Sequence, residues 1–257
     1  MRPNCLAYLT IQLFVVCLLL LFCSSCPATA DDAFNQLWGG FSTSLVLRSD
    51  QQRHNTATAA HDLDQVIIAP GETFSFNQRV GARDSGKGYR AAPIINASGL
   101  LEDIPGGGIC QLASTIYNAG LLAGMQVVER HPHSRTVGHV PPGRDATIAS
   151  WRKDLKLKNP FPYPLQLRIV LNWNRLTTSL YGPVAKPFST QIIVNRTRLE
   201  PDTVVLSSSA NRPQQTGTSG FSTETRRITK ENGQVRDELI SLDIYPAPSR
   251  IVAGTSR

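Results

Sequence analysis

The stretch IPGGGICQLASTIYNAGLLA, residues 104–123, decides the fold that we expect. Its apolar residues recur at helical spacing from Ile109 onward, so the pattern predicts a central helix that ends near residue 123. The three residues ahead of this helix are all glycine, which lets the backbone turn sharply (Gly106, Gly107 and Gly108). Cys110 therefore lies in the first turn of the predicted helix.

A thiol in a first helical turn faces unpaired N–H groups and the positive end of the helix dipole, and both favour the thiolate. The thiolate is the nucleophilic form, so Cys110 is a candidate catalytic nucleophile. Backbone N–H groups from Gly108 to Gln111 would stabilise an oxyanion, and Gly106 and Gly107 complete that loop. The alternative is that Cys110 is a small hydrophobe buried beside its apolar neighbours and that the glycines form only a tight turn.

A cysteine nucleophile needs a base, and the only dense histidine cluster lies downstream, in ERHPHSRTVGHV, residues 129–140. A strand over QVVERHPH would run back beside the helix and return an imidazole to the thiol. His131 and His133 are two residues apart and face the same side of an extended chain, so the sequence does not choose between them. A structural role for both is the alternative, and we expect His139, like His54 and His61, at the surface.

The segment PPGRDAT, residues 141–147, offers Asp145 as a carboxylate that orients the base and Arg144 as a clamp for a substrate carboxylate. With Ser134 these two residues form the substrate-binding set that we expect. The alternative is that Arg144 and Asp145 pair with each other on a turn. A zinc site made of Cys110 and two histidines fits no closed structural zinc pattern, and we expect neither a metal nor a cofactor.

The N-terminus resembles an export signal. Arg2 precedes the long apolar run LAYLTIQLFVVCLLLLFC, and Ala28-Thr29-Ala30 forms a small-residue cleavage site. We expect an exported, extracytoplasmic protein, with two alternatives: residues 6–25 stay as an anchor in the cytoplasmic membrane, or Cys26 is lipidated. Four of the five cysteines lie in this segment, which leaves one unpaired thiol in the mature chain.

Composition places the rest of the chain among ordinary globular proteins. It has 257 residues, of which 41% are hydrophobic and 18% charged, with a formal net charge of +7. The sequence contains no long basic block, so we expect no nucleic-acid partner.

The expected fold is α+β: one strand-rich domain with a short N-terminal helix, the central helix and a C-terminal β-hairpin appendage. We expect an export segment over residues 1–30, the main domain over 31–182, a linker with one possible strand over 183–220 and the hairpin over 221–257. The hairpin is predicted from Asn232-Gly233. The other expected elements are a helix from Asn55 to Val66 capped by Asn55, a strand over 72–81 with Phe74 and Phe76 on one side, and strands near 92–96, 125–131, 147–151, 155–157, 165–171 and 189–199.

Three long motifs resemble the VanW family of bacterial envelope proteins. They are PGETFSFNQRVGARDSGKGYRAAPII, PGGGICQLASTIYNAGLLAGMQVVERHPHS and VPPGRDATI, the last followed by DLKLKN. The resemblance runs from about Arg53 to Tyr181. This chain departs from the usual family pattern at His139, where an aromatic residue is more common.

The resemblance implies an activity as well as a family. Some members are understood to act as L,D-transpeptidases, which join peptidoglycan stem peptides through a cysteine acyl-enzyme, with Cys110, His131 and His133 at the matching positions. We therefore expect a cysteine-dependent acyl-transferase of peptidoglycan stem peptides. A cysteine endopeptidase of peptidoglycan and a non-enzymatic envelope-binding or assembly module, of the kind associated with glycopeptide-resistance clusters, are the alternatives.

Overall fold

The computed structural model describes residues 33–95, 101–149, 152–206 and 215–253. The predicted export segment with its four cysteines and part of the predicted linker lie outside the described residues.

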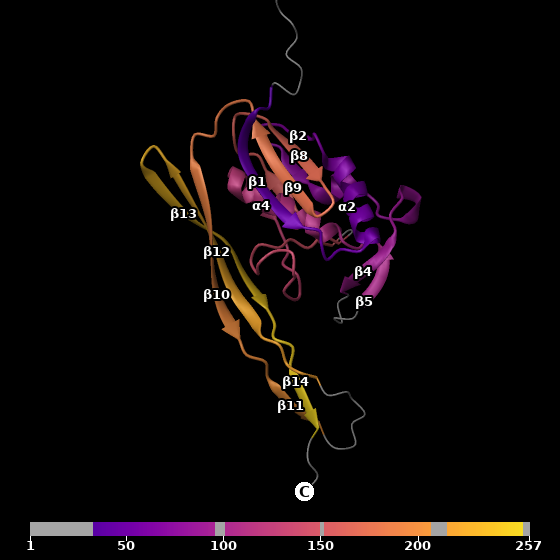
Figure 1. Cartoon of the computed structure of the whole chain (residues 1–257). Helices are drawn as coiled ribbons and strands as arrows, with labels where there is room; N and C mark the ends of the chain where they lie inside the picture. Colours follow the sequence, from indigo (N-terminus) through magenta and orange to yellow (C-terminus); the bar gives the residue numbers. More distant parts are fainter. Residues whose placement is uncertain (1–32, 96–100, 150–151, 207–214, 254–257) are drawn as a thin grey trace, which may run out of the picture.

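The secondary structure is a mixture of helices and many strands, which confirms the α+β class (Figure 1). In chain order the elements are β1 (Gln36–Ser44), α2 (Asp50–Leu63), β2 (Ile67–Ile68), β3 (Thr73–Ser75), α3 (Phe76–Val80), the 3-10 turn η1 (Ser85–Lys87), β4 (Ala91–Ile95), β5 (Leu101–Pro105), α4 (Ile109–Ala123), β6 (Gln126–Glu129), β7 (Lys156–Lys158), β8 (Leu165–Leu171), β9 (Arg175–Gly182), β10 (Ser189–Leu199), β11 (Thr203–Leu206), β12 (Gly220–Glu231), β13 (Gln234–Tyr245) and β14 (Arg250–Ala253).

The body of the protein is an antiparallel sheet in the order β1-β9-β8-β2, with α4 packed against β1 and β9. The helix lies very close to β1, because a Cβ on Gly39 would fall 2.4 Å from the backbone nitrogen of Ala123 and 2.5 Å from the carbonyl oxygen of Ala119. Nearly every side chain of α4 is buried. This explains why the strongest helical pattern in the sequence belongs to the element at the centre of the core.

Helix α2 begins earlier than the sequence pattern predicted. Its N-cap is Ser49, whose hydroxyl accepts from the backbone N–H of Gln52 while the Gln52 side chain accepts from the backbone N–H of Ser49. This reciprocal capping box satisfies two of the free N–H groups at the helix start. Asn55, which we expected to be the cap, is buried inside the helix.

Two predicted strands are not found as expected, and residues 150–151 of the second lie outside the described residues. The strand over residues 72–81 ends at Ser75, because the Ser75 hydroxyl caps the short helix α3, which begins at Phe76. Residues 147–149 form no strand, and Ala149 makes only an isolated bridge with Lys153. Two small sheets complete this part of the fold: the three-stranded sheet β3-β7-β6 and the hairpin β4-β5.

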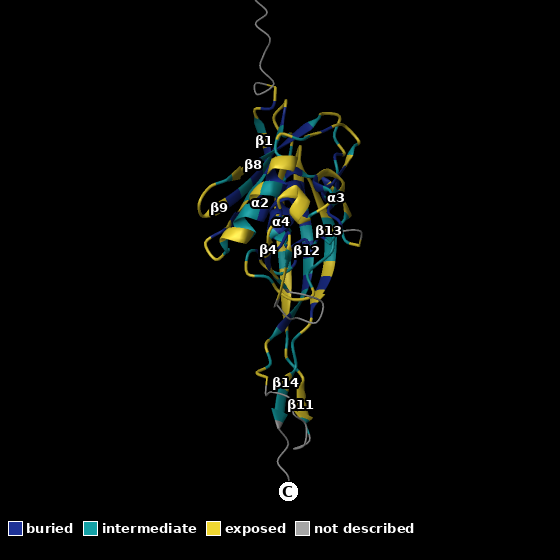
Figure 2. Ribbon diagram, turned by 90° about the vertical axis from the view of Figure 1, so that its right-hand side faces the viewer, coloured by how far each residue is buried: buried dark blue, intermediate teal, exposed yellow. Residues whose placement is uncertain are grey.

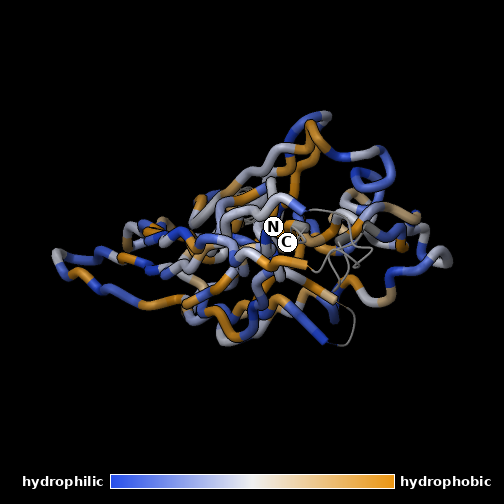
Figure 3. Tube along the Cα trace, turned by 90° about the horizontal axis from the view of Figure 1, so that it is seen from below, coloured by the Kyte–Doolittle hydropathy of each residue, from blue (hydrophilic) through white to orange (hydrophobic). Residues whose placement is uncertain are grey.

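The C-terminal part is a three-stranded antiparallel sheet, β10-β12-β13, followed by the parallel pair β11-β14 (Figure 1). Asn232 and Gly233 both have positive φ, 48° and 79°, as the predicted tight hairpin turn between β12 and β13 requires. One face of β12 is buried against the body, whereas β11 and β14 lie away from it and are exposed or half-buried (Figure 2). The tips of the projecting loops are hydrophilic (Figure 3).

Candidate active site

The glycine run holds the start of α4 against two other elements. Gly106 and Gly108 have φ of 87° and 104°, in the left-handed region that favours glycine. A Cβ on Gly107 would lie 2.3 Å from the carbonyl oxygen of Ala92 in β4, and one on Gly108 would lie 2.9 Å from Cβ of Gln52 in α2. The run therefore lets the backbone pass between β4 and α2 and leads into the first turn of α4, where Cys110 is partly exposed.

Asn55 ties this turn to α2. Its side-chain N–H groups donate to the carbonyl oxygens of Gly107 at 3.0 Å and Arg90 at 2.8 Å, and its carbonyl oxygen accepts from the Arg90 N–H at 2.8 Å. The side chain is fully buried. Asn55 is thus a structural clamp on the loop that precedes the thiol.

Cys110 is a partly exposed free cysteine in the first turn of α4, and it is the only cysteine in the part of the chain that the structure describes. Its Sγ lies 3.6 Å from the carbonyl oxygen of Ile148. Burial opposes ionisation of the thiol. The hydrogen bond and the charge of His133 outweigh it, with a further contribution from Arg83, so the pKa of Cys110 lies below its ordinary value.

His133 is bound to Asp145 through two of its groups. Nδ1 of the ring lies 2.6 Å from Oδ2 of Asp145, and the backbone N–H of His133 donates to the same oxygen at 2.7 Å. Because Nδ1 faces the carboxylate, Nε2 is the nitrogen left for Cys110. Cys110, His133 and Asp145 therefore stand in the order of nucleophile, base and orienting acid.

The charges of the three groups favour an ion pair. Burial lowers the pKa of His133, but the hydrogen bonds to Asp145 and Cys110 raise it to about 9. Burial raises the pKa of Asp145, but its hydrogen bond to His133 and the charge of Arg130 lower it to about 2. The directions of these three shifts all favour a thiolate beside an imidazolium, with a carboxylate behind it.

The structure distinguishes the two candidate histidines. Nε2 of His131 lies 3.0 Å from Oε1 of Glu129, so this ring is engaged with a neighbouring carboxylate, and it is His133 whose hydrogen bond and charge lower the pKa of Cys110. Ser134 is exposed beside His133. Of the three residues in this segment, only His133 is brought to the thiol.

Gln111 does not face the site. Its carbonyl oxygen accepts from Nε of Arg48 at 2.5 Å, and its amide nitrogen donates to Thr43 Oγ1 at 2.9 Å and to the carbonyl oxygen of Ser44 at 2.8 Å. The side chain is buried, at 1% exposure. Gln111 therefore connects α4 to the end of β1 rather than contributing its amide to an oxyanion site.

The backbone donors near the thiol are partly used. The N–H of Ile109 donates to Gly106 and that of Gln111 to Gly108. Among the described residues, the N–H of Cys110 itself has no carbonyl partner. This N–H would therefore donate to the oxyanion that forms when Sγ attacks a carbonyl carbon.

Arg144 is not brought to the thiol. Its guanidinium binds the side-chain oxygen of Asn118 and lies 5.3 Å above the ring of Phe41. Arg144 and Asp145 do not form the alternative turn pair either, because the cation bound to the Asp145 carboxylate is Arg130, at 3.0 Å.

Two other arginines interact electrostatically with the thiol, and the sequence offered no signal for either. The charge of Cys110 acts on Arg48 and on Arg83, although burial lowers the pKa of both guanidinium groups. Arg83 also binds the side-chain oxygen of Asn77 and lies 5.9 Å above the ring of Phe76. These two cations come from segments far upstream of Cys110, after β1 and after α3, and only the fold brings them together.

His139, which we expected at the surface, belongs to the surroundings of the site. Its Nδ1 accepts from Nη2 of Arg48 at 3.1 Å, which leaves Nε2 protonated to donate to Oγ of Ser114 at 3.1 Å. Its ring centre lies 6.1 Å from that of His133. Burial, Arg48 and His133 lower the pKa of His139 to about 3, so it is neutral and fixes the position of Arg48.

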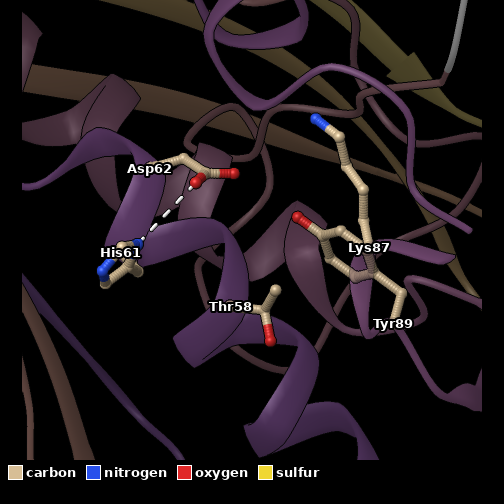
Figure 4. Close-up of a pocket in the computed structure, with 5 residues that line it drawn as sticks. All are labelled: Thr58, His61, Asp62, Lys87 and Tyr89. Atoms are coloured by element: carbon tan, nitrogen blue, oxygen red, sulfur yellow. Dashed lines mark ion pairs between the residues drawn. The ribbon is translucent and has the colours of Figure 1, made fainter. Parts of the chain in front are cut away.

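Two cavities lie away from the thiol. One, of about 420 Å³, is lined by Thr58, His61, Asp62, Lys87 and Tyr89 (Figure 4). The other, of about 700 Å³, lies between the body and β12-β13 and includes Phe161 and Phe188. Neither is lined by the Cys110, His133 and Asp145 group, so the chemistry rather than the size of a hollow locates the candidate site.

Over the described ranges, no three His, Cys, Asp or Glu side chains are arranged to hold a metal ion. No helix in the part of the chain that the structure describes is long and apolar enough to span a membrane.

Two curated proteins are similar to about half of this chain. The uncharacterized protein YoaR of Bacillus subtilis is 40% identical over 147 residues, which is 57% of this chain and 48% of YoaR. The vancomycin B-type resistance protein VanW of Enterococcus faecalis is 29% identical over 144 residues, 53% of this chain and 51% of that protein. The chain thus spans about half the length of the curated relatives that it matches.

Among solved structures, HP0197-G5 is similar to 26% of this chain at 16% identity, and the match covers 97% of that structure. Its TM-score is 0.18, which is too low to show a shared fold. The family model for VanW-like proteins matches residues 51–181, about half of the chain, and this span contains Cys110, His133 and Asp145. The chain therefore belongs to the VanW family.

Proposed function

We propose that this protein is an exported, cysteine-dependent acyl-transferase of the cell wall that acts on peptidoglycan stem peptides, in the manner of an L,D-transpeptidase. The observation that carries the proposal is the group of Cys110, His133 and Asp145, in which a first-turn thiol interacts with an imidazole whose Nδ1 binds a buried carboxylate. This arrangement supports acyl transfer through a thioester.

In the first half of the reaction, the Cys110 thiolate attacks a stem-peptide carbonyl and forms a C–S bond. The carbonyl oxygen becomes an oxyanion, which the N–H of Cys110 stabilises. Collapse of this intermediate breaks the C–N bond, and the His133 imidazolium gives its proton to the departing amine. The products are a thioester on Cys110, a free amine and neutral His133.

In the second half, neutral His133 takes a proton from the amine of a second stem as that amine attacks the thioester. A new amide bond forms, the C–S bond breaks, and the site returns to thiolate and imidazolium. Water in place of the amine would give hydrolysis by the same steps. The acceptor therefore decides between a transpeptidase and an endopeptidase.

Arg48 and Arg83 suit a substrate that carries a carboxylate close to the carbonyl under attack. Both guanidinium groups interact with the charge of Cys110 and have lost part of their hydration. A C-terminal residue that leaves as the amine carries such a carboxylate next to the bond that breaks. We assign the role that we expected of Arg144 to these two residues, since guanidinium groups bind carboxylates well.

The choice of a cell-wall substrate rests on the family. One relative is by name a vancomycin resistance protein, and the motifs around Cys110 and His133 resemble those of family members understood to be L,D-transpeptidases. The apolar segment before residue 31 supports export.

The test is to incubate the protein with stem-peptide fragments and to follow the products by mass spectrometry, with Cys110→Ala and Cys110→Ser as matched variants. Cross-linked dimers that need Cys110 support the proposal, whereas shortened stems alone would show an endopeptidase. If both variants give the same products as the parent chain, or if no product forms and Cys110 reacts with iodoacetamide only after denaturation, the enzymatic proposal fails and a binding module remains.

A further inference from the structure

The C-terminal sheet reaches the carboxylate that orients the base. Asp145 uses Oδ2 for His133, while Oδ1 accepts from Nη2 of Arg130 at 3.0 Å and from the hydroxyl of Tyr245, at the end of β13. The carboxylate is fully buried. One oxygen is thus fixed from the C-terminal side, and the other is presented to the imidazole.

The hydroxyl of Tyr245 makes three hydrogen bonds, two as acceptor and one as donor. It accepts from the backbone N–H of Gly143 at 2.8 Å and from Nη2 of Arg130 at 3.3 Å, so its own proton is directed to Asp145. The side chain is among the largest fully buried ones, at 1% exposure. Such a donor fixes both the distance and the direction of the Asp145 carboxylate.

Asp243, two residues earlier on the same face of β13, holds Arg130. Its Oδ1 lies 2.5 Å from Nη1 of Arg130, and the two side chains are 5% and 3% exposed. Nε of Arg130 donates in addition to the backbone oxygen of Asp145 at 2.7 Å. Arg130 is therefore oriented by Asp243, and it binds both the side-chain carboxylate and the backbone carbonyl of Asp145.

A further contact locks the sheet to the loop that carries Asp145. Oγ1 of Thr225, in β12, donates to the carbonyl oxygen of Gly143 at 3.1 Å. A Cβ on Gly143 would lie 2.7 Å from that Oγ1, so the loop and the strand are in direct contact. The sheet holds both the backbone and the side chain of this loop.

These sheet residues lie outside residues 51–181, the part of the chain that matches the family. We propose that Tyr245 and Asp243 are positioning residues of the thiol site: through Asp145 they fix His133 in the orientation in which it contacts Cys110. The C-terminal sheet is then a working part of the site rather than an appendage. This inference rests on the proposed function, because it concerns the same thiol.

The physical basis is the rotational freedom of a carboxylate. With Oδ1 held by two donors, Oδ2 points to Nδ1 of His133, and the imidazole keeps the tautomer and tilt that direct Nε2 to Cys110. Without the Tyr245 hydroxyl, the Asp145 side chain is held by Arg130 and His133 alone. Its hold on His133 weakens, and the thiolate loses part of the cation that stabilises it.

The test measures the thiol directly and needs no knowledge of the substrate. We would follow the rate of iodoacetamide addition to Cys110 against pH in the full chain, reading the peptide that contains Cys110 by mass spectrometry. The variants are Tyr245→Phe and Asp243→Asn. The matched controls are Tyr163→Phe, a half-exposed tyrosine, and Asp237→Asn, on the opposite face of β13 with its side chain 49% exposed.

We expect each variant to slow alkylation of Cys110 at pH 7 by about threefold to tenfold and to move the midpoint of its pH profile upward by ~0.5–1 unit, while both controls keep the parent profile. Circular dichroism checks folding, and Asp243→Asn carries the test if Tyr245→Phe does not fold.

The outcomes separate the two proposals. A parent midpoint below the ordinary thiol range that does not change in Tyr245→Phe and Asp243→Asn overturns this inference and leaves the proposed function standing. An equal shift in the controls also overturns it. A parent midpoint at the ordinary ~8.5 overturns the proposed function, and this inference with it.

Discussion

Oδ2 of Asp145 accepts two hydrogen bonds from one residue, His133: from Nδ1 at 2.6 Å and from the backbone N–H at 2.7 Å. The carboxylate therefore fixes both the ring and the chain that carries it. Replacing Asp145 by Asn leaves the shape but removes the charge that keeps His133 protonated. We expect the rate of Cys110 alkylation at pH 7 to fall by about tenfold or more.

The control for this change is Asp202→Asn at an exposed site. Thermal unfolding must show that Asp145→Asn is still folded at the assay temperature. An unchanged alkylation profile in a folded Asp145→Asn protein would show that the carboxylate does not act on the thiol.

The two histidines of the RHPHS segment should behave differently. His133→Ala removes the base and the cation beside Cys110, so we expect loss of product formation and a thiol pKa that returns toward the ordinary ~8.5. His131→Ala removes only a contact with Glu129 and should keep both properties. Product yield and the alkylation profile measure the two, and the opposite ranking of the variants would make His131 the base.

The pH dependence of acyl transfer should be bell-shaped. The rate rises with pH as Cys110 loses its proton, and this limb lies below the ordinary thiol range because the pKa of Cys110 is lowered. The rate falls again as His133 loses its proton, with a pKa of about 9, because the departing amine then receives none. A profile of kcat/KM against pH that continues to rise above pH 9 would contradict an acid role for His133.

The anion-binding role of Arg48 and Arg83 predicts a preference for a free carboxylate. For Arg83→Gln we expect KM for a stem fragment ending in a carboxylate to rise by about tenfold, with little change for the corresponding C-terminal amide. Arg48→Gln should act in the same direction. Arg79→Gln, whose side chain pairs with Glu72 at the surface, is the control. Equal effects on the carboxylate and the amide would refute this role.

The glycine run makes a prediction about stability. A Cβ on Gly107 would collide with the carbonyl of Ala92, so Gly107→Ala forces β4 or the start of α4 to move and should cost ~1–3 kcal/mol of unfolding free energy. Gly138 has open space around its Cβ position, and Gly138→Ala should have almost no effect. Chemical denaturation measures both, and equal stability of the two variants would show that the contact is relieved without cost.

Local patterns predicted the elements that are decided by nearby residues. The helix after the glycine run and the hairpin at Asn232-Gly233 follow from spacing and turn chemistry, and both are present. The cap of α2 was missed although its signal, a serine followed three residues later by a glutamine, stands in the sequence at Ser49 and Gln52. The strand predicted through Phe76 failed because a cap at Ser75 outweighs the alternation of two phenylalanines.

The candidate site likewise combines residues that the sequence predicted with residues that only the tertiary structure identifies. Cys110 and Asp145 stand in segments whose chemistry is readable, and geometry was needed to choose His133 over His131. Arg48 lies 63 positions from its partner Gln111, and Tyr245 lies 100 positions from Asp145. No short-range rule predicts pairs that only the tertiary fold brings into contact.

The contact between Tyr245 and Asp145 has a practical consequence for anyone who expresses part of this gene. A fragment trimmed near residue 182, where sequence similarity to the family ends, would lose β13 and leave the Arg130 guanidinium without Asp243. Such a fragment would contain all the family motifs, but we expect the reactivity of its Cys110 thiol to differ from that in the intact protein. Cloning boundaries are therefore better drawn after Tyr245 than at the edge of the recognisable homology.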